Sequence, residues 1–215
     1  GFVSEAVVNF VALLGWSPEG DREIFSLKEL AEVFDYRRIS KSPAVFDMTK
    51  LRWMNGEYFK AMAPEEFYRR GEKYLKEYVT KPLDLKKIAE MVRTRVETFL
   101  DIRDMVDFFN ELPAYETELF VNKKSKSSLE SSREILGDVL PKLEAVESWN
   151  NDALFALLKA YGEEKGYKTG LVMWPLRIAL SGKLMTPAGA TEIMDVLGKE
   201  ESLLRLREGQ KKLGA

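Results

Sequence analysis

The sequence predicts an all-α protein built as a multi-helix array. Helical signals run almost from end to end of the 215 residues, and no stretch has the period-two alternation of a half-buried strand. The composition, 45% apolar and 32% charged, is that of an ordinary globular chain rather than a disordered one. A chain of this length forms one large domain or two to three small ones. We expect three successive helical blocks, near 1–63, 64–125 and 126–215.

The first helix of the first block is expected to begin at Ser4, which can cap it. It should end near Gly15–Trp16, before a turn that contains proline and glycine. We expect Trp16 and Trp53 to be packing residues. The apolar face that we expect the helix to bury includes Val7, Val8, Val11 and Leu14.

Two further helices of this block carry capping signals. Ser26 and Glu29 have the spacing of a capping box at the start of a short helix. Asp47 can cap a helix over Met48–Met54, and Gly56 is placed as its C-terminal stop.

The second block begins at Pro64, which opens a charged amphipathic helix. Leu85–Arg95 and Ile102–Leu112 follow as a shorter helical pair. The polar, basic and serine-rich segment Asn122–Ser128 is expected to be a solvated linker, although its lysines can also contact phosphates. The third block is expected to contain the helices Leu129–Val146 (interrupted by Gly137 and Pro141), Ala153–Lys165, Gly170–Leu180, Glu192–Leu197 and a charged helix after Gly198.

Missing residue types exclude several classes of function. The chain has no cysteine, so it has neither disulfides nor thiolate metal sites, which fits a reducing cytoplasm. It also has no histidine, which excludes Ser-His and Cys-His nucleophile pairs and the usual zinc sites. No apolar run approaches the roughly 20 residues that span a bilayer, so no membrane association is expected. A net charge of −2 means that basic residues must be concentrated locally if the chain binds nucleic acid.

The pentapeptide Arg38–Ser42, RISKS, resembles the lysine-bearing signature loop of class I aminoacyl-tRNA synthetases, which steadies ATP phosphates during adenylate formation. That chemistry also requires a nucleotide-binding parallel sheet and a histidine-containing partner motif. This chain has no histidine and no alternation of strands and helices. We therefore interpret the peptide as a loop before the Asp47-capped helix, and we expect no catalytic residue in the chain.

Three ordered blocks resemble bacterial-type glutamyl-tRNA synthetases. They are AVVNFVALLGWSP at 6–18, SPAVFD with KLRWMNG across 42–56, and PLRIALSG with TP across 175–187. By this resemblance the chain starts just after the catalytic domain's own signature loop. It would comprise the end of a stem-contact domain followed by two helical anticodon-binding domains.

The resemblance implies that the chain binds tRNA, while other parts of a longer protein catalyse the attachment of the amino acid. The full-length parent would use ATP and Mg²⁺ to attach glutamate to tRNA in the cytoplasm, whereas this portion would be inactive alone. No cofactor is expected in the chain itself. Its partner would be a glutamate-accepting tRNA rather than DNA, and the protein is expected to be a monomer. Anticodon bases are single-stranded and can be read along their edges.

By the same resemblance, Arg95 would contact the last anticodon base, and Arg93 could support it or a phosphate. The alternative is that arginines at the end of the Leu85–Arg95 helix simply complement the helix dipole.

The resemblance places Arg177, with the loop of Thr186 and Pro187, beside the first two anticodon bases. A snorkelling or ion-paired Arg177 is the alternative. Trp174 could offer a stacking face or belong to the core, and Lys183 is a further candidate for tRNA contact. The contribution of Ala188–Ala190 stays open, because aligning this loop with some relatives requires an added residue.

Two other classes of function stay open. The chain could be a helical protein-interaction module, or a paralogue that no longer binds tRNA, because amphipathic helices and near-neutral charge permit either. An independent ATP-using enzyme would need an ATP pocket near Lys41.

Overall fold

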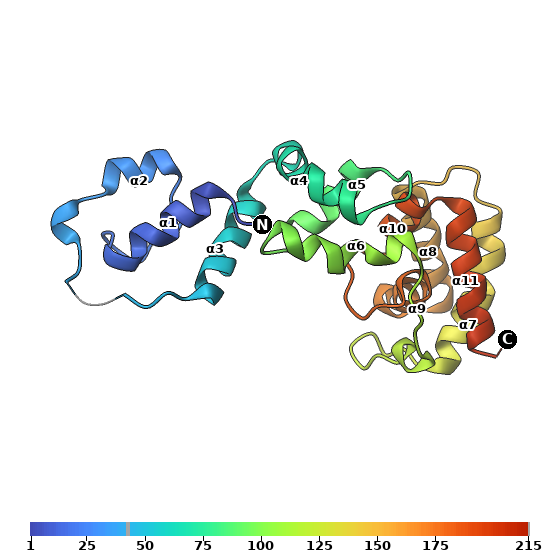
Figure 1. Ribbon diagram of the computed structural model, residues 1–215. Coiled ribbons are helices and arrows are strands. Elements are labelled where there is room, and N and C mark those ends of the chain that lie inside the picture. Colours follow the sequence, from blue (N-terminus) through green and yellow to red (C-terminus); the bar gives the residue numbers. More distant parts are fainter. Residues whose placement is uncertain (42–43, 215) are drawn as a thin grey trace. The chain divides into compact units, whose positions relative to one another are not determined.

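The computed structural model describes residues 1–41 and 44–214 (Figure 1). Within those ranges the chain forms eleven α-helices, three 3-10 turns and two isolated β-bridges, without strands. The predicted all-α fold is therefore confirmed. The chain divides by its contacts into two compact units, Gly1–Tyr78 with Ala89–Asp104 and Val79–Ile88 with Met105–Ala215. The division into blocks 1–63, 64–125 and 126–215 stays a prediction.

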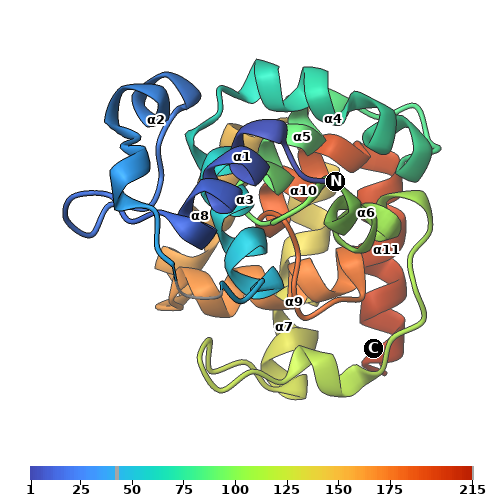
Figure 2. The same cartoon turned by 60° about the vertical axis from the view of Figure 1, so that its left-hand side comes forward.

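The first unit contains four helices of the N-terminal half and the end of a fifth. Helix α1 lies beside α3, as Figure 2 shows. Phe10 of α1 packs with Leu51 and Met54 of α3, and a second cluster joins Trp16, Phe25 and Leu30. The elements are α1 (Ser4–Gly15), α2 (Leu27–Val33), η1 (Tyr36–Arg38), α3 (Met48–Ala61), α4 (Pro64–Tyr78), the second half of α5 (Leu85–Arg93) and η2 (Phe99–Asp101), with the start of α6 (Ile102–Asn110).

Helix α1 buries a different face from the one we predicted, except at Leu14, which is partly buried against the cluster of Phe10. Ala6, Asn9 and Phe10 are its buried residues, whereas the predicted core residues Val7, Val8 and Val11 are exposed. The buried amide of Asn9 explains this rotation, because its Oδ1 accepts hydrogen bonds from the Phe25 backbone N–H (2.9 Å) and the Tyr58 hydroxyl (2.8 Å). Ser4 does not cap the helix either. Val3 occupies the cap position and Ser4 is the first helical residue.

The predicted N-terminal caps of α2 and α3 are confirmed, whereas the predicted C-terminal end of α3 is wrong. Ser26 and Glu29 form the expected capping box, and the Asp47 carboxylate accepts from two backbone N–H groups at the start of α3. Gly56 does not stop α3, which continues to Ala61 because Gly56 is buried against the segment that precedes η2. Trp53 was expected to pack but is 42% exposed.

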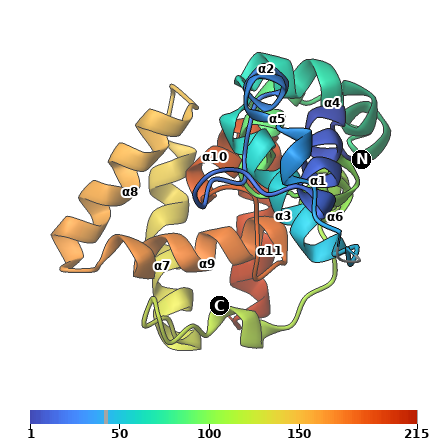
Figure 3. The same cartoon turned by 90° about the vertical axis from the view of Figure 1, so that its left-hand side faces the viewer.

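The second unit is built around α9, which packs against four other helices (Figure 3). It contains the first part of α5 and most of α6, followed by η3 (Thr117–Phe120), α7 (Leu129–Glu144), α8 (Asn151–Lys165), α9 (Thr169–Ser181), α10 (Ala190–Leu197) and α11 (Lys199–Lys212). Helix α7 is continuous through Gly137 and Pro141, where we expected interruptions.

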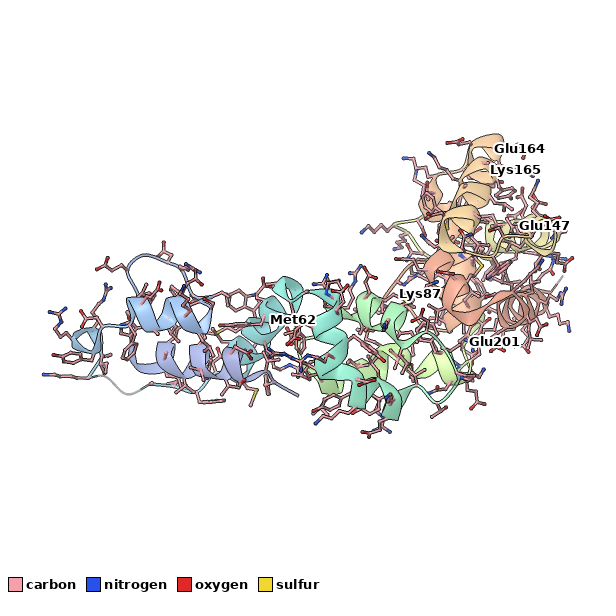
Figure 4. The ribbon with its side chains drawn as sticks, turned by 90° about the horizontal axis from the view of Figure 1, so that it is seen from above. Met62, Lys87, Glu147, Glu164, Lys165 and Glu201 are labelled. Carbon is pink, nitrogen blue, oxygen red and sulfur yellow. The ribbon has the colours of Figure 1, made fainter. Side chains whose placement is uncertain are left out.

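Arg205 of α11 connects its helix to α6 and α9 in the second unit. The guanidinium of Arg205 is 1% exposed and pairs with Glu201 at 2.7 Å. It also donates to the carbonyls of Phe108 and Leu180, both at 2.8 Å, so this buried charge is compensated. Figure 4 labels Glu201 on α11 and Lys165 at the end of α8. Among the described helices, none has both the length and the apolar character that crossing a bilayer requires.

Within the segment that we predicted to be a solvated linker, residues Asn122–Ser127 form an ordered hairpin and Ser128 caps α7. Asn122 and Ser127 exchange two backbone hydrogen bonds of 3.0 Å, which close the turn between them. The Asn122 side chain accepts from the Ser125 backbone N–H at 2.9 Å and from its hydroxyl at 3.1 Å. The serines that suggested a flexible linker therefore make the hydrogen bonds that order it.

Candidate nucleic-acid interface

A cavity of about 750 Å³ lies within the second unit. Its walls come from the hairpin after η3, the first turns of α8 and α10, and one face of α9. Trp174 and Arg177 of α9 both line it, together with Lys124 of the hairpin and Phe155 of α8. The cavity is therefore bordered by two aromatic rings and two cations, which are groups suited to a nucleobase and its phosphate.

Arg177 is half-buried at this cavity and has no carboxylate partner among the described residues. Its Nη1 donates to the Thr186 hydroxyl at 2.8 Å, and its Nη2 donates to the Leu184 carbonyl at 3.0 Å. The guanidinium carbon lies 4.5 Å from the centre of the Trp174 ring, within the range of a cation–π contact. Burial lowers the pKa of Arg177, although arginine stays charged. This half-buried cation is positioned by neutral groups alone.

The Thr186 hydroxyl has a defined hydrogen-bond direction. It accepts from Arg177 and donates its own proton to the Ala188 carbonyl at 2.8 Å. One lone pair of the hydroxyl oxygen is left, so Thr186 can accept from a ligand but cannot donate to it. Arg177 and Thr186, which the sequence analysis placed at the same anticodon bases, are thus joined directly, with Arg177 as a donor beside Thr186 as an acceptor.

The other residues of this loop have different surroundings. Pro187 is buried, so it stiffens the loop rather than presenting a surface. Lys183 pairs with Asp107, which holds the loop on α6. Leu184 and Met185 are exposed, 55% and 74% respectively, and sequence reasoning missed them. Because they are apolar and unburied, they are additional surfaces on which a base can pack.

Trp174 combines the two alternatives that the sequence left open. Its indole N–H donates to the Leu119 carbonyl at 2.9 Å, which anchors the side chain against η3. Its ring lines the cavity and makes the cation–π contact with the Arg177 guanidinium. Trp174 is therefore fixed in place while part of its ring stays accessible.

Arg95 lies in the first unit, on the turn that follows α5, and its side chain is exposed. No hydrogen bond or ion pair joins its guanidinium to another described residue. The turn itself is held firmly, since Val96 is buried and the next residues are bonded to Asp101, whose Oδ2 accepts from the backbone N–H groups of Glu97 and Thr98. The side chain of Arg95 is thus free to bind a ligand from an ordered support.

Arg93 has a structural contact instead. Its Nη1 lies 2.6 Å from the Lys60 carbonyl, 3.0 Å from that of Met62 and 3.2 Å from that of Phe59. These carbonyls belong to the end of α3, where backbone acceptors lack partners within the helix. Arg93 therefore caps α3, and its role toward RNA stays a prediction.

The RISKS peptide is also engaged in structure. Arg38 donates to the Pro18 carbonyl at 2.7 Å and pairs with Glu19 at 3.0 Å. Ile39 forms an isolated β-bridge with Trp16, so the peptide is fixed to the end of α1. Ser42 lies outside the described residues. Arg38 and Ile39 thus fix this loop to the end of α1 and to the turn that follows it.

Two carboxylates at the rim of the cavity had no signal in the sequence beyond ordinary helix starts. Asp152 and Glu192 lie in the first turns of α8 and α10, and both line the cavity. Glu192 accepts from the Gly189 backbone N–H at 2.8 Å, as part of a helix cap. With Lys124 and Arg177 on the other walls, the cavity presents both signs of charge, which suits a ligand with donors as well as acceptors.

Two family models match the chain. One, described as an anticodon binding domain, covers residues 66–210, and the other, described as the catalytic domain of class I tRNA synthetases (E and Q), covers residues 1–53. The chain is 53% identical over 215 residues to a glutamate–tRNA ligase of Lachnoclostridium phytofermentans, and 50% identical over 214 residues to one of Clostridium acetobutylicum. These matches cover 100% and 99% of the chain but only 44% of each relative.

Solved structures give the same likeness. A glutamate tRNA ligase from Elizabethkingia meningosepticum, in complex with its amino acid, matches 99% of the chain with a TM-score of 0.81 and 28% identity. A glutamate-tRNA synthetase from Elizabethkingia anophelis matches 98% with a TM-score of 0.80 and 27% identity. The chain covers 42% and 41% of those two proteins.

Proposed function

Because the chain belongs to the anticodon-binding domain family and corresponds to the C-terminal portion of bacterial glutamate–tRNA ligases, we propose that it binds and reads the anticodon arm of a glutamate-accepting tRNA. The whole protein would attach glutamate to that tRNA in the cytoplasm, using ATP and Mg²⁺, and would act as a monomer. The chain's own share is recognition. We propose no ATP-binding role for the RISKS peptide, whose Arg38 is bonded to Pro18 and Glu19.

The proposal rests mainly on Arg177, whose half-buried charge has no carboxylate partner among the described residues. A buried guanidinium normally pairs with a carboxylate, as Arg205 does with Glu201 in the same unit. Arg177 has only neutral partners, and its side chain lines an open cavity. A ligand rich in acceptors and π-electrons would supply the interaction that this cation lacks, and a nucleobase has both properties.

The hydrogen-bond pattern of the site favours a particular kind of base edge. Two of the five N–H groups of Arg177 are bonded within the protein, so three can donate to base acceptors. Thr186 beside it can only accept, because its proton is bonded to Ala188. An edge with an acceptor next to a donor, such as the O4 and N3–H of uracil, meets both requirements.

Arg95 would act as a second reader, in the first unit. Its exposed guanidinium and the ordered turn beneath it suit a bidentate contact with a base, which discriminates by about 1–3 kcal/mol. The family resemblance assigns it the last anticodon base.

A comparison of tRNAs tests the proposal. We expect the chain to bind glutamate tRNA saturably, more tightly than an unrelated tRNA of equal length, with affinity that falls as salt rises. Equal, weak binding to every tRNA at every salt concentration would contradict it. Weak absolute affinity would not, because the parent's remaining domains would hold the acceptor end.

A further inference from the structure

We propose that the hairpin Asn122–Ser127 is a phosphate clamp, whose three lysines (Lys123, Lys124 and Lys126, the hairpin lysines) bind the RNA backbone of the nucleotide that enters the cavity. The inference rests on the proposed function and adds a second kind of contact to it. Arg177 and Thr186 would read a base edge, whereas the hairpin lysines would hold the strand without reading its sequence.

The hairpin is ordered by its own hydrogen bonds and anchored at its base. Ser127 is 4% exposed, and its hydroxyl lies 3.0 Å from that of Ser132 on α7. The Ser132 hydroxyl in turn reaches toward the Phe120 carbonyl at 3.5 Å, and Phe120 is fully buried. A charged side chain on such a support loses less conformational entropy on binding than one on a mobile linker.

One hairpin residue has a strained backbone. Lys126 has φ of +60°, which makes it the only described non-glycine residue with positive φ. A residue with a Cβ pays roughly 1–2 kcal/mol for this conformation, and glycine would adopt it freely. A lysine at a position that favours glycine is consistent with a need for its charge.

The hairpin lysines also differ in their surroundings from three lysines of α7 and α8. All three are exposed, and none has a carboxylate within ion-pair distance in the described part of the chain. By contrast, Lys142, Lys159 and Lys165 lie 4.0, 3.8 and 2.8 Å from a carboxylate oxygen. The hairpin is therefore a local concentration of uncompensated positive charge in a chain whose net charge is −2.

The position of the hairpin supplies the link to the cavity. Asn122, Lys124 and Ser125 form one of its walls, and Trp174 and Arg177 line the same space. A base that stacks on Trp174 would leave its sugar and phosphate at the rim, where an ammonium group acts as a point charge toward phosphate. The ligand class is thus a single-stranded RNA nucleotide held by base and phosphate together.

Salt dependence of binding separates this role from base reading. The 215-residue chain would be titrated into a labelled anticodon stem-loop of glutamate tRNA at several KCl concentrations from about 0.05 to about 0.4 M. Counterion release is measured over a range of this kind. The double variant Lys123→Gln/Lys124→Gln would be compared with Lys142→Gln/Lys159→Gln, which removes the same charge from paired lysines of the same unit. Lys126→Gly would remove the third charge and also the backbone strain that the positive φ imposes on a residue with a Cβ.

Removing one lysine–phosphate interaction with a single strand should reduce the slope of log affinity against log salt by about 0.7. We therefore expect the hairpin double variant to bind about tenfold more weakly near 0.15 M salt, with a shallower slope. Its preference for the glutamate anticodon should be unchanged. The control variant should match wild type, and Lys126→Gly should lower the slope without lowering the melting temperature.

Two outcomes would overturn the clamp. A hairpin double variant with the wild-type slope would do so while leaving the proposed function intact, provided that wild type still selects the glutamate anticodon. A wild-type chain that selects no anticodon would overturn the proposed function and the clamp together.

Discussion

The Arg177 guanidinium lies 4.5 Å from the centre of the Trp174 ring, and both side chains line the same cavity. The two residues are one helical turn apart on α9, a spacing that puts them on one face of the helix. Trp174 is anchored by its indole N–H, so the ring can hold the guanidinium without a carboxylate. Together they form a cationic, aromatic surface that suits a stacked base.

Replacing Trp174 tests the aromatic half of this surface. Trp174→Leu should weaken binding of the glutamate anticodon stem-loop by about 1–3 kcal/mol, the usual contribution of one stacked base. Trp149→Leu is the matched control, because that indole also donates to a carbonyl at 2.9 Å in the same unit but does not line the cavity. Fluorescence anisotropy would measure both. Equal losses in the two variants would indicate general destabilisation instead of stacking.

Arg95→Gln tests the reader in the first unit. We expect affinity for the glutamate anticodon stem-loop to fall about tenfold, and discrimination at the last anticodon base to relax, because glutamine cannot reproduce the bidentate geometry of arginine. Arg103→Gln removes an equal charge from an exposed position of the same unit and should change affinity less than about twofold. The base-reading role of Arg95 fails if both variants lose affinity equally for stem-loops that differ in that base.

Acid should weaken the first unit partly through Glu5. Two hydrogen bonds from Arg70, of 2.8 and 3.0 Å, lower the pKa of the Glu5 carboxyl to about 2 from its ordinary 4.5. A folded-state pKa below the unfolded one stabilises the protein fully above pH 4.5, and this stabilisation is lost as pH falls from 4.5 toward 2. Allowing for solvent screening, it is worth about 1–2 kcal/mol.

The variant Glu5→Gln isolates that contribution. At pH 7 its free energy of unfolding in urea should be about 1–2 kcal/mol below that of wild type. The difference between the two proteins should shrink as pH falls below 4.5. A difference that is constant from pH 7 to pH 3 would show that the ion pair does not carry the effect.

Two helical glycines of the second unit should respond to alanine in opposite directions. A Cβ at Gly209 of α11 would lie 2.6 Å from the Ala179 Cβ of α9, so the two helices would have to separate. We expect Gly209→Ala to destabilise the protein by about 1–3 kcal/mol. A Cβ at Gly137 of α7 would meet only Gln210, at 3.5 Å, so Gly137→Ala should stabilise it by up to about 1 kcal/mol. Urea titrations that give both changes the same sign would contradict this packing.

Much of the fold follows from local chemistry in the sequence. The capping box of Ser26 and Glu29, the Asp47 cap and the start of α4 at Pro64 depend on residues a few positions apart. The buried face of α1 does not. Its sequence is apolar on several sides, and the hydrogen bonds of Asn9 to Phe25 and Tyr58 decide which side faces inward.

The candidate site was harder to predict, because its parts come from separated segments. Arg177 and Thr186 were picked out by family resemblance, and only the structure joins them through a hydrogen bond. The hairpin looked like a linker because the pairing of Asn122 with Ser127 has no strong sequence pattern. The carboxylates of Asp152 and Glu192 looked like ordinary helix starts, and their position at the cavity depends on how α8 and α10 pack.

A two-by-two binding measurement tests most directly whether Arg177 reads an anticodon base. Wild type and Arg177→Ala would each be titrated with the glutamate anticodon stem-loop and with one whose middle base, a uracil in tRNAs that read glutamate codons, is replaced by cytosine. Wild type should prefer the uracil stem-loop by about tenfold, and Arg177→Ala should bind both stem-loops equally weakly. If Arg177→Ala loses affinity for both by the same factor and keeps the wild-type preference, Arg177 contributes charge alone and does not read the base.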